Sequence, residues 1–167
     1  MNRNQTQPRH TSHNLRAHST TTEHNESMNS RQDGACVAIR CGTQVLVVRT
    51  RRHPSKWQPI GGGVEPGETA LEAACREMFE ECGTRIDPET LEHVSSHPMD
   101  VDDTTGSGEL HFFQLWLTTS ALNEAYAGAQ TCPELAEARL VTIEELSTLE
   151  TFEAAGRFLQ TLATKNG

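Results

Sequence analysis

Three glutamates that lie close together on a predicted helix are the residues of this sequence best suited to chemistry. At about 100° per residue of an α-helix, Glu77, Glu80 and Glu81 fall within an arc of about 100°. Each like-charged pair at this spacing costs an isolated helix about 0.2 to 0.5 kcal/mol, and acids in the last turns oppose the helix dipole. Helix stability alone therefore does not favour these residues. Because clustered hard oxygen ligands suit Mg²⁺ or Mn²⁺, we expect the glutamates to bind such an ion.

These acids could also be accommodated without a metal, in either of two ways. Arg76 can reach Glu80 or Glu72, although a single guanidinium cannot neutralise four acids. A surface helix can also leave its glutamates solvated and without a ligand.

A glycine-rich loop precedes the helix and brings further acids to its start. We interpret residues 51–67 as this loop, in which the triple glycine at 61–63 lets the backbone approach a ligand closely. The loop delivers Glu65 and Glu68 to the beginning of the helix. This arrangement favours a binding site over a solvated acidic surface.

A basic segment lies just upstream of the glycines, beside His53. In an acidic protein such a local positive charge could focus an anionic substrate, and an aromatic ring offers a surface for stacking. The alternative is an exposed strand end edged with charge. Lys56 belongs to the same segment. The predicted substrate-binding residues are Arg49, Arg51, Arg52 and Trp57.

The helix that carries the acids has clear ends in the sequence. Thr69 and Glu72 match a capping box, and Gly83 is the residue type that ends helices in a left-handed conformation. We therefore predict a helix over residues 69–82. One apolar stripe repeats every three or four positions, and we expect the glutamates opposite it. The stripe consists of Leu71, Cys75, Met78 and Cys82.

Runs of β-branched and aromatic residues predict a sheet around this helix. The predicted strands are residues 35–41, 44–49, 91–96, 110–119 and 139–141. The first two form a hairpin around Gly42. Two helices close the chain, and the first begins with a second capping box, Thr142 with Glu145. This order predicts a mixed β-sheet flanked by helices, of the α/β or α+β class.

Composition limits the function classes. The chain of 167 residues has the length of one domain and a formal charge of −9, so we expect no polymeric nucleic-acid partner. No stretch reaches the ~20 apolar residues that cross a bilayer, and no secretory signal begins the chain. We therefore expect a cytoplasmic protein without a membrane partner. The five cysteines contain no C-x-x-C pair and indicate neither a disulfide framework nor a zinc site.

Residues 1–32 differ in composition from the rest of the chain. They hold no aromatic residue, Ile or Val, but four Arg, four of the eight His and a net charge of +2. Such a segment buries too little apolar surface to order itself, so we predict a disordered tail at 1–32 and one domain at 33–167. The alternatives are a histidine-based metal chelator, an organelle presequence, and an extension upstream of a true start at Met28.

The glycines and acids follow a spacing that resembles the Nudix box, G-x5-E-x7-R-E-U-x-E-E-x-G-U, in which U is aliphatic. Gly62 begins the match, Glu68 follows, and residues 76–83 read R-E-M-F-E-E-C-G. Thr84 departs from the last aliphatic position. The order of elements over residues 34–164 is compatible with the rest of a Nudix domain.

The resemblance implies an α/β/α sandwich that presents Mg²⁺ or Mn²⁺ to the diphosphate of a substrate. Arg76 and Glu68 are implied to form a pair that holds Glu77, which makes these three residues and Glu80 the catalytic candidates. The implied chemistry is attack by water on a phosphorus of the pyrophosphate. The implied metal ligands are Glu77, Glu80, Glu81 and the carbonyl of Gly61. The base that accepts the water proton stays open between Glu77, Glu80, Glu134 and Glu137.

Substrate choice depends on residues outside the box. The leading expectation is a (d)NTP or a related small nucleotide. The alternatives are ADP-ribose or another nucleotide sugar, a dinucleoside polyphosphate, and a non-catalytic domain that senses nucleotides. Residues 97–103 do not fit a calcium loop, so we interpret them as a loop that lines the pocket. Exposed apolar surfaces on a strand and on the C-terminal helix could form a homodimer.

Overall fold

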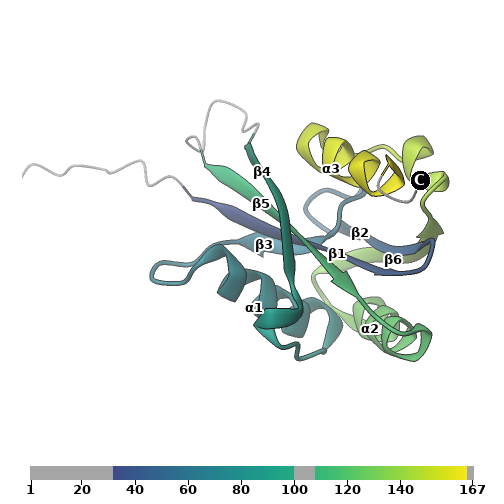
Figure 1. Cartoon of the computed structure of the whole chain (residues 1–167), viewed down its shortest axis with the longest axis horizontal. Helices are drawn as coiled ribbons and strands as arrows, with labels where there is room; N and C mark the ends of the chain where they lie inside the picture. Colours follow the sequence, from purple (N-terminus) through teal and green to yellow (C-terminus); the bar gives the residue numbers. More distant parts are fainter. Residues whose placement is uncertain (1–31, 100–107, 165–167) are drawn as a thin grey trace, which may run out of the picture.

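The computed structural model describes residues 32–99 and 108–164 and shows a mixed β-sheet between two layers of helices (Figure 1). The strands of this sheet lie in the order β4-β5-β1-β2-β6, and β3 pairs with β1 beside this path. This arrangement is the predicted α/β/α sandwich. The strands are β1 (Gly34–Cys41), β2 (Gln44–Thr50), β3 (Ile60–Gly63), β4 (Glu92–Pro98), β5 (Glu109–Trp116) and β6 (Leu135–Thr142).

Strand β1 is the centre of the sheet. It pairs in parallel with β5, from Gly34 opposite Leu110 to Arg40 opposite Trp116. Its first half pairs antiparallel with β3 and its last residues pair antiparallel with β2. The predicted hairpin between β1 and β2 is confirmed, and Gly42 in its turn adopts a left-handed conformation with φ 57°.

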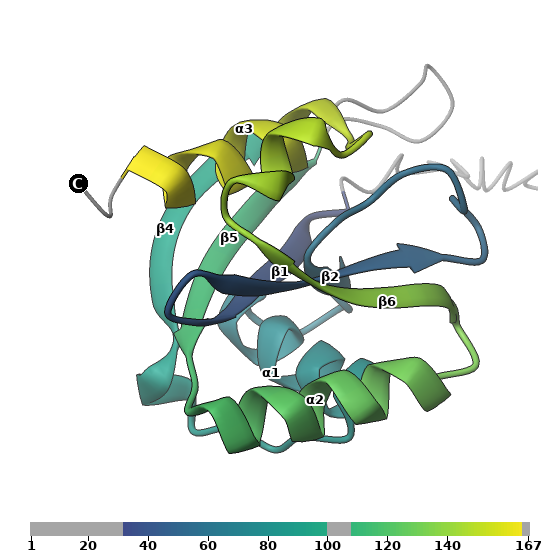
Figure 2. The same ribbon diagram turned by 90° about the vertical axis from the view of Figure 1, so that its right-hand side faces the viewer.

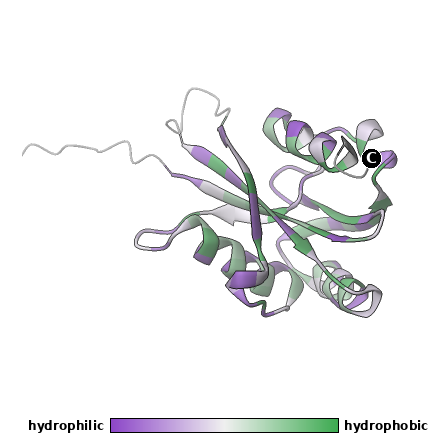
Figure 3. Ribbon diagram, viewed as in Figure 1, coloured by the Kyte–Doolittle hydropathy of each residue, from purple (hydrophilic) through white to green (hydrophobic). Residues whose placement is uncertain are grey.

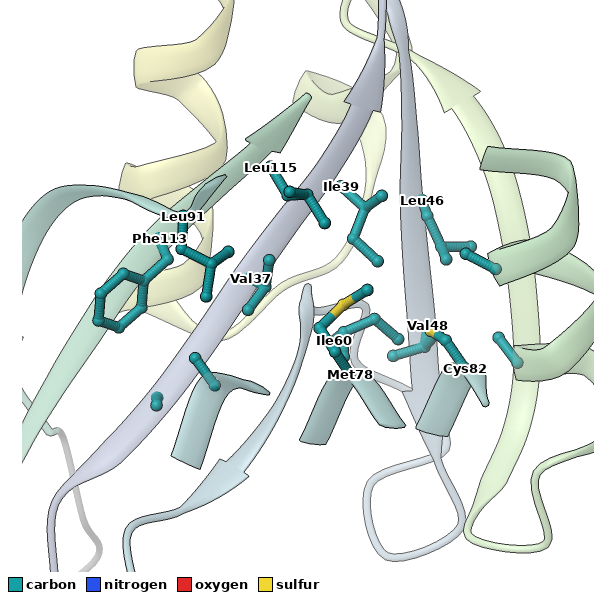
Figure 4. Close-up of a cluster of buried hydrophobic side chains, with 14 of the residues drawn as sticks. Val37, Ile39, Leu46, Val48, Ile60, Met78, Cys82, Leu91, Phe113 and Leu115 are labelled. Carbon is teal, nitrogen blue, oxygen red and sulfur yellow. The ribbon is translucent and has the colours of Figure 1, made fainter. Parts of the chain in front are cut away.

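Helices α1 (Ala70–Cys82) and α2 (Thr119–Thr131) cover one face of the sheet, and α3 (Glu153–Thr164) covers the other (Figure 2). Successive strand residues point to opposite faces, so Val37 packs in the layer of α1 while Ala38 packs in the layer of α3. Figure 4 shows strand residues gathered with residues of α1 in the first of these layers. None of the helices described is long and apolar enough to cross a membrane.

Helix α1 has the predicted ends but a different buried side. The side chain of Thr69 accepts a hydrogen bond from the amide of Glu72, the reciprocal bond is present, and Gly83 ends the helix with φ 66°. Figure 3 shows hydrophobic and hydrophilic segments alternating along the helix. Leu71 is only half-buried, as is Cys75, because the helix packs its other side against β3. The fully buried side consists of Ala73, Ala74, Glu77, Met78, Glu81 and Cys82.

Several predicted boundaries were wrong. The glycines at 61–63 belong to strand β3, because they pair with β1. Helix α2 was not predicted, and its first residue, Thr119, was assigned to the preceding strand, which ends at Trp116. Strand β6 is longer than predicted because it pairs with β2 along its length, and the segment after Thr142 is a short 3-10 helix (Glu145–Thr148). In the predicted loop at 97–103, His97 and Pro98 instead belong to β4, because they pair with β5, and residues 100–103 lie outside the described residues. Residues 1–31 of the predicted tail at 1–32 also lie outside them.

Candidate active site

Strand β3 brings glycine backbone against helix α1. A Cβ on Gly61 would lie 2.2 Å from the carbonyl oxygen of Ala35, so only glycine fits this close approach to β1. A Cβ on Gly62 would lie 2.4 Å from Oε1 of Glu77. The first two glycines therefore serve two different purposes, since Gly61 allows the strand to pair and Gly62 leaves space for a carboxylate.

Two of the three helix glutamates are buried against this strand. Glu77 is 9% exposed and Glu81 is 4% exposed, whereas Glu80 is exposed. Oε2 of Glu81 accepts a hydrogen bond of 3.0 Å from the amide of Gly61. The prediction that all three acids lie opposite the apolar side was therefore wrong, because the glycines of β3 have no side chains and leave room for Glu77 and Glu81 against the strand.

Burial makes ionisation of these two acids unfavourable. Burial raises the pKa of Glu81 to about 8, against the opposing hydrogen bond from Gly61, and the nearby charges of Glu77 and Glu134 raise it further. Burial also raises the pKa of Glu77, although Arg76 partly offsets this effect. A positive charge beside these two adjacent carboxylates would favour their ionised forms.

Arg76 supplies part of that charge and fixes the acids around it. Its guanidinium donates hydrogen bonds to Glu68 at 2.7 Å, to Glu77 at 2.6 Å and to Glu80 at 2.9 Å. It also donates a bond of 2.8 Å to the carbonyl of Gly63. These contacts raise the pKa of Arg76, so it stays charged. The pair with Glu68 that the resemblance implies is present in the structure, and the predicted contact with Glu72 is replaced by the capping box.

A divalent cation fits this donor set. The carboxylates supply hard oxygen ligands, and the two buried ones lack a full counter-charge. Within residues 32–99 and 108–164, no three acidic, histidine or cysteine side chains lie together as a group that could hold a metal ion. Oxygens of Glu77 and Glu80 are instead paired with Arg76. Mg²⁺ does not require a closed cage, since it is usually bound by one or two carboxylates together with water and substrate phosphates.

Glu134, one of the candidate bases, lies near the buried acids. Its charge raises the pKa of both Glu77 and Glu81. Arg51 holds this segment, because its amide donates to the carbonyl of Glu134 at 2.9 Å and its Nε donates to the carbonyl of Pro133 at 2.7 Å. The predicted substrate residue Arg51 therefore lies beside the acids, with one of its side-chain donors already in use.

Arg49 and Glu137 lie on the other face of the sheet. Arg49 follows Val45 and Val47 at alternate positions of β2, and these valines pack in the layer of α3. Arg49 pairs with Glu137 at 2.8 Å. Glu137 is therefore not a good candidate for the base, because the sheet separates it from the helix that carries the acids.

Trp57 is part of the core rather than an exposed stacking surface. It is 5% exposed and packs in the layer of α3. Its backbone bonds to Glu150, and the guanidinium of Arg49 lies 4.2 Å from the centre of its ring. The predictions that Trp57 offers a free face and that Arg49 is free for a ligand were therefore wrong. Arg52 is exposed.

Gly63 is a contributor that sequence reasoning missed. Its carbonyl accepts a hydrogen bond from Arg76, which ties the end of β3 to the helix. The sequence contains no signal for this contact, because any residue type supplies a backbone carbonyl. The pairing of β3 with β1 decides where that carbonyl lies, and this pairing was not predicted because the triple glycine was interpreted as a loop.

Comparison with known proteins is consistent with this geometry. The family model of the NUDIX domain matches residues 30–162. Diphosphoinositol polyphosphate phosphohydrolase 2 of Rattus norvegicus is 38% identical over 66 residues, which are 40% of this chain and 37% of that protein. The chain thus spans little more than a third of the length of the curated relatives it matches.

Solved structures show the same fold. A mutT/nudix family protein from Listeria innocua superposes with a TM-score of 0.64 at 20% identity, covering 80% of this chain and 92% of that one. The dihydroneopterin triphosphate pyrophosphohydrolase of E. coli superposes with a TM-score of 0.61 at 19% identity, covering 77% and 92%. The fold and the acidic helix define an α/β/α domain of the Nudix type. The chain belongs to the Nudix hydrolase family.

Proposed function

We propose that this protein is a Mg²⁺-dependent pyrophosphohydrolase that cleaves a nucleoside diphosphate linked to another moiety, with a (d)NTP or related small nucleotide as substrate. One observation carries the proposal: Glu77 and Glu81 are buried against the glycines of β3, where they lack a full counter-charge. Family membership supports hydrolysis of a phosphoanhydride, and the E. coli pyrophosphohydrolase with the same fold acts on a triphosphate.

The ion would be held by Glu77, Glu80 and Glu81, with the carbonyl of Gly61 as a further ligand. Bound there, it supplies neutralisation of the charge that develops on the phosphate oxygens. Arg76 positions the ligands, because it bridges Glu77 and Glu80 and is itself fixed by Glu68. Mn²⁺ has the same preference for oxygen ligands and is the alternative ion.

The reaction also needs a base that takes a proton from the attacking water. Glu77 and Glu80 both accept hydrogen bonds from Arg76, so carboxylate oxygens of both residues are already in use. Glu134 is exposed and close enough to influence both buried acids. We therefore place the water proton on Glu134 and keep Glu77 and Glu80 as metal ligands. The oxygen of the water forms a bond to phosphorus as the bridging oxygen leaves.

The charge of the site favours a nucleotide over a diphosphoinositol polyphosphate, the substrate class in the name of the matched rat protein. Such a substrate carries phosphates all round a ring and requires many uncompensated cations. In the described part of the basic segment, Arg49 is paired with Glu137 and Lys56 with Glu150. Arg51 and Arg52 remain, which suits the few phosphates of a nucleotide.

A substrate panel tests this proposal. The purified protein is incubated with Mg²⁺ and a (d)NTP set, ADP-ribose, a dinucleoside tetraphosphate or a diphosphoinositol polyphosphate, and the release of phosphate, pyrophosphate or NMP is measured. We expect turnover of the nucleotides, loss of at least 100-fold in Glu81→Gln, and full activity in Glu124→Gln, which changes an exposed acid on α2.

The outcomes separate the alternatives. Preferred turnover of the inositol substrate or of ADP-ribose would reject the nucleotide assignment but keep the chemistry. Calorimetric binding of nucleotides without any cleavage would indicate the sensing domain instead. Nearly full activity in Glu81→Gln would refute the proposed metal site.

A further inference from the structure

Arg40 is the most buried charged side chain in the described part of the chain. It is 1% exposed and lies near the end of β1. Its Nη2 donates one long bond of 3.3 Å to the carbonyl of Gly42, and its Nε has no hydrogen-bond partner among the described residues. No described carboxylate forms a salt bridge with it. An unpaired buried cation is costly, and a bound anion would offset that cost.

Trp116 covers this guanidinium. Cζ of Arg40 lies 4.0 Å from the centre of the indole ring, and the indole is 52% exposed. Strand β4 pairs with β5 only as far as Gln114, so no residue of β4 pairs with Trp116. An anion would reach Arg40 by displacing the Trp116 side chain, whose indole is exposed.

Arginine side chains also stack on a second tryptophan of this protein, and there they form ion pairs with a carboxylate, which Arg40 does not. Arg49 and Arg139 lie 4.2 Å and 4.9 Å from the ring of Trp57. Both also pair with Glu137, at 2.8 Å and 2.6 Å. At Trp57 the stacked arginines also pair with a carboxylate. At Trp116 no described carboxylate pairs with the stacked Arg40.

We propose that Arg40, beneath Trp116, forms a second anion site that binds a phosphate-type oxyanion. A guanidinium offers several N–H donors in a planar fork that matches phosphate. The phosphate can be free or attached to a nucleotide, and the exposed indole favours neither by itself.

This site is separate from the acidic site. Arg40 is two positions after Ala38 and faces the layer of α3, whereas Glu77 and Glu81 lie on the α1 side. Gly61, whose amide bonds to Glu81, pairs with Cys36, and Arg40 lies four residues further along β1, which at ~3.3 Å per residue is about 13 Å. The second site can therefore fail while the proposed hydrolysis stands, and the reverse also holds.

Binding is tested without metal, so that the acidic site cannot recruit phosphate through Mg²⁺. The full-length protein in EDTA is titrated with inorganic phosphate or with AMP, against KCl of equal ionic strength, while tryptophan fluorescence and melting temperature are recorded. We expect a saturable response that is at least 10-fold weaker in Arg40→Met and unchanged in Arg139→Met. The fluorescence response should be lost in Trp116→Phe. Equal affinity for the two probes indicates free phosphate, and at least 10-fold tighter AMP binding indicates a nucleotide.

A response that does not saturate, or that persists in Arg40→Met, overturns the proposal. Stability in phosphate-free buffer provides an independent test. If the buried guanidinium is an anion site that is empty in this buffer, its charge is uncompensated, and Arg40→Met should melt at or above the wild-type temperature. If Arg40→Met melts well below it, the guanidinium is structural and the proposal is overturned.

Discussion

Gly62 lies directly beneath the carboxylate of Glu77, with no room between them for a methyl group. A Cβ built on Gly62 would lie 2.4 Å from Oε1 and 2.7 Å from Cδ of Glu77. The glycine is thus required by the side chain that packs over it rather than by its backbone conformation, since a positive φ in β3 occurs at Gly61 and not at Gly62.

Gly62→Ala should therefore disable the site while leaving the fold intact. The added methyl group displaces Glu77, and a misplacement of about 1 Å in a catalytic group costs on the order of 100-fold in rate. We expect this loss in kcat, with a melting temperature close to wild type. Gly42→Asn is the control, because asparagine tolerates the left-handed conformation of that distant turn. Unchanged kcat in Gly62→Ala would contradict the role given to Glu77.

Arg76→Lys should show that geometry matters at this position as well as charge. Lysine keeps the positive charge but lacks the fork that reaches Glu68, Glu77 and Glu80 together. Loss of partners that orient metal ligands costs about 10–100-fold in metal affinity or activity. We expect a loss of this size, measured by titrating Mg²⁺ at saturating nucleotide. Arg85→Lys, which changes an exposed arginine, should leave the titration unchanged.

The stability of the metal-free protein should fall as pH rises from about 4.5 to about 8. Burial raises the pKa of Glu81 from an ordinary value of 4.5 to about 8, so in this window the folded protein holds a proton that the unfolded chain has lost. The folded state is therefore favoured at the acidic end of the window. Melting curves in EDTA across this range test the slope, and Glu81→Gln should flatten it. Added Mg²⁺ should stabilise the wild type more at pH 8 than at pH 6, because only the ionised carboxylates bind it.

The ends of α1 could be predicted because local chemistry decides them. Thr69 and Glu72 satisfy each other's amides, and Gly83 adopts the conformation that other residues avoid. Helix α2 carries no comparable signal, since a single threonine bond caps its start and its sequence includes Gly128. Gly128 is explained only by tertiary packing, because a Cβ there would lie 1.9 Å from the carbonyl oxygen of Cys82.

The site was predictable in its residue types but not in its burial. The spacing of the glutamates indicates a metal, yet the burial of Glu77 and Glu81 depends on the pairing of the glycines with β1. The sequence could have predicted which face of the sheet Arg49 occupies, because Arg49 alternates with Val45 and Val47 along the strand and must share their face. Trp57 was not, since its burial depends on the segment at Glu150 far along the chain.

Removal of residues 1–32 should leave folding and hydrolysis unchanged, which also tests the proposed domain at 33–167. The hydrogen bonds that hold the start of β1 are made by a residue that follows this segment. Asp33 accepts the amide of Glu109 at 2.8 Å through its side chain and the amide of Val64 at 2.8 Å through its carbonyl. The melting temperature and kcat/KM of the shortened protein are compared with those of the full chain, and a large loss in either would contradict the prediction.

Arg49 and Arg52 should respond differently to the same change, although both belong to the basic segment. Arg49 pairs with Glu137 and stacks on Trp57, so Arg49→Ala removes packing and one of the two arginines that pair with Glu137. We expect a loss of about 1 kcal/mol in the free energy of unfolding, measured by urea denaturation, with a small effect on KM. Arg52 is exposed, so Arg52→Ala should leave stability unchanged and raise KM for a nucleotide by weakening attraction to its phosphates. The rise in KM should shrink at high salt, because screening already removes that attraction from the wild type. An unchanged KM in Arg52→Ala at low salt would show that the basic segment does not serve the substrate.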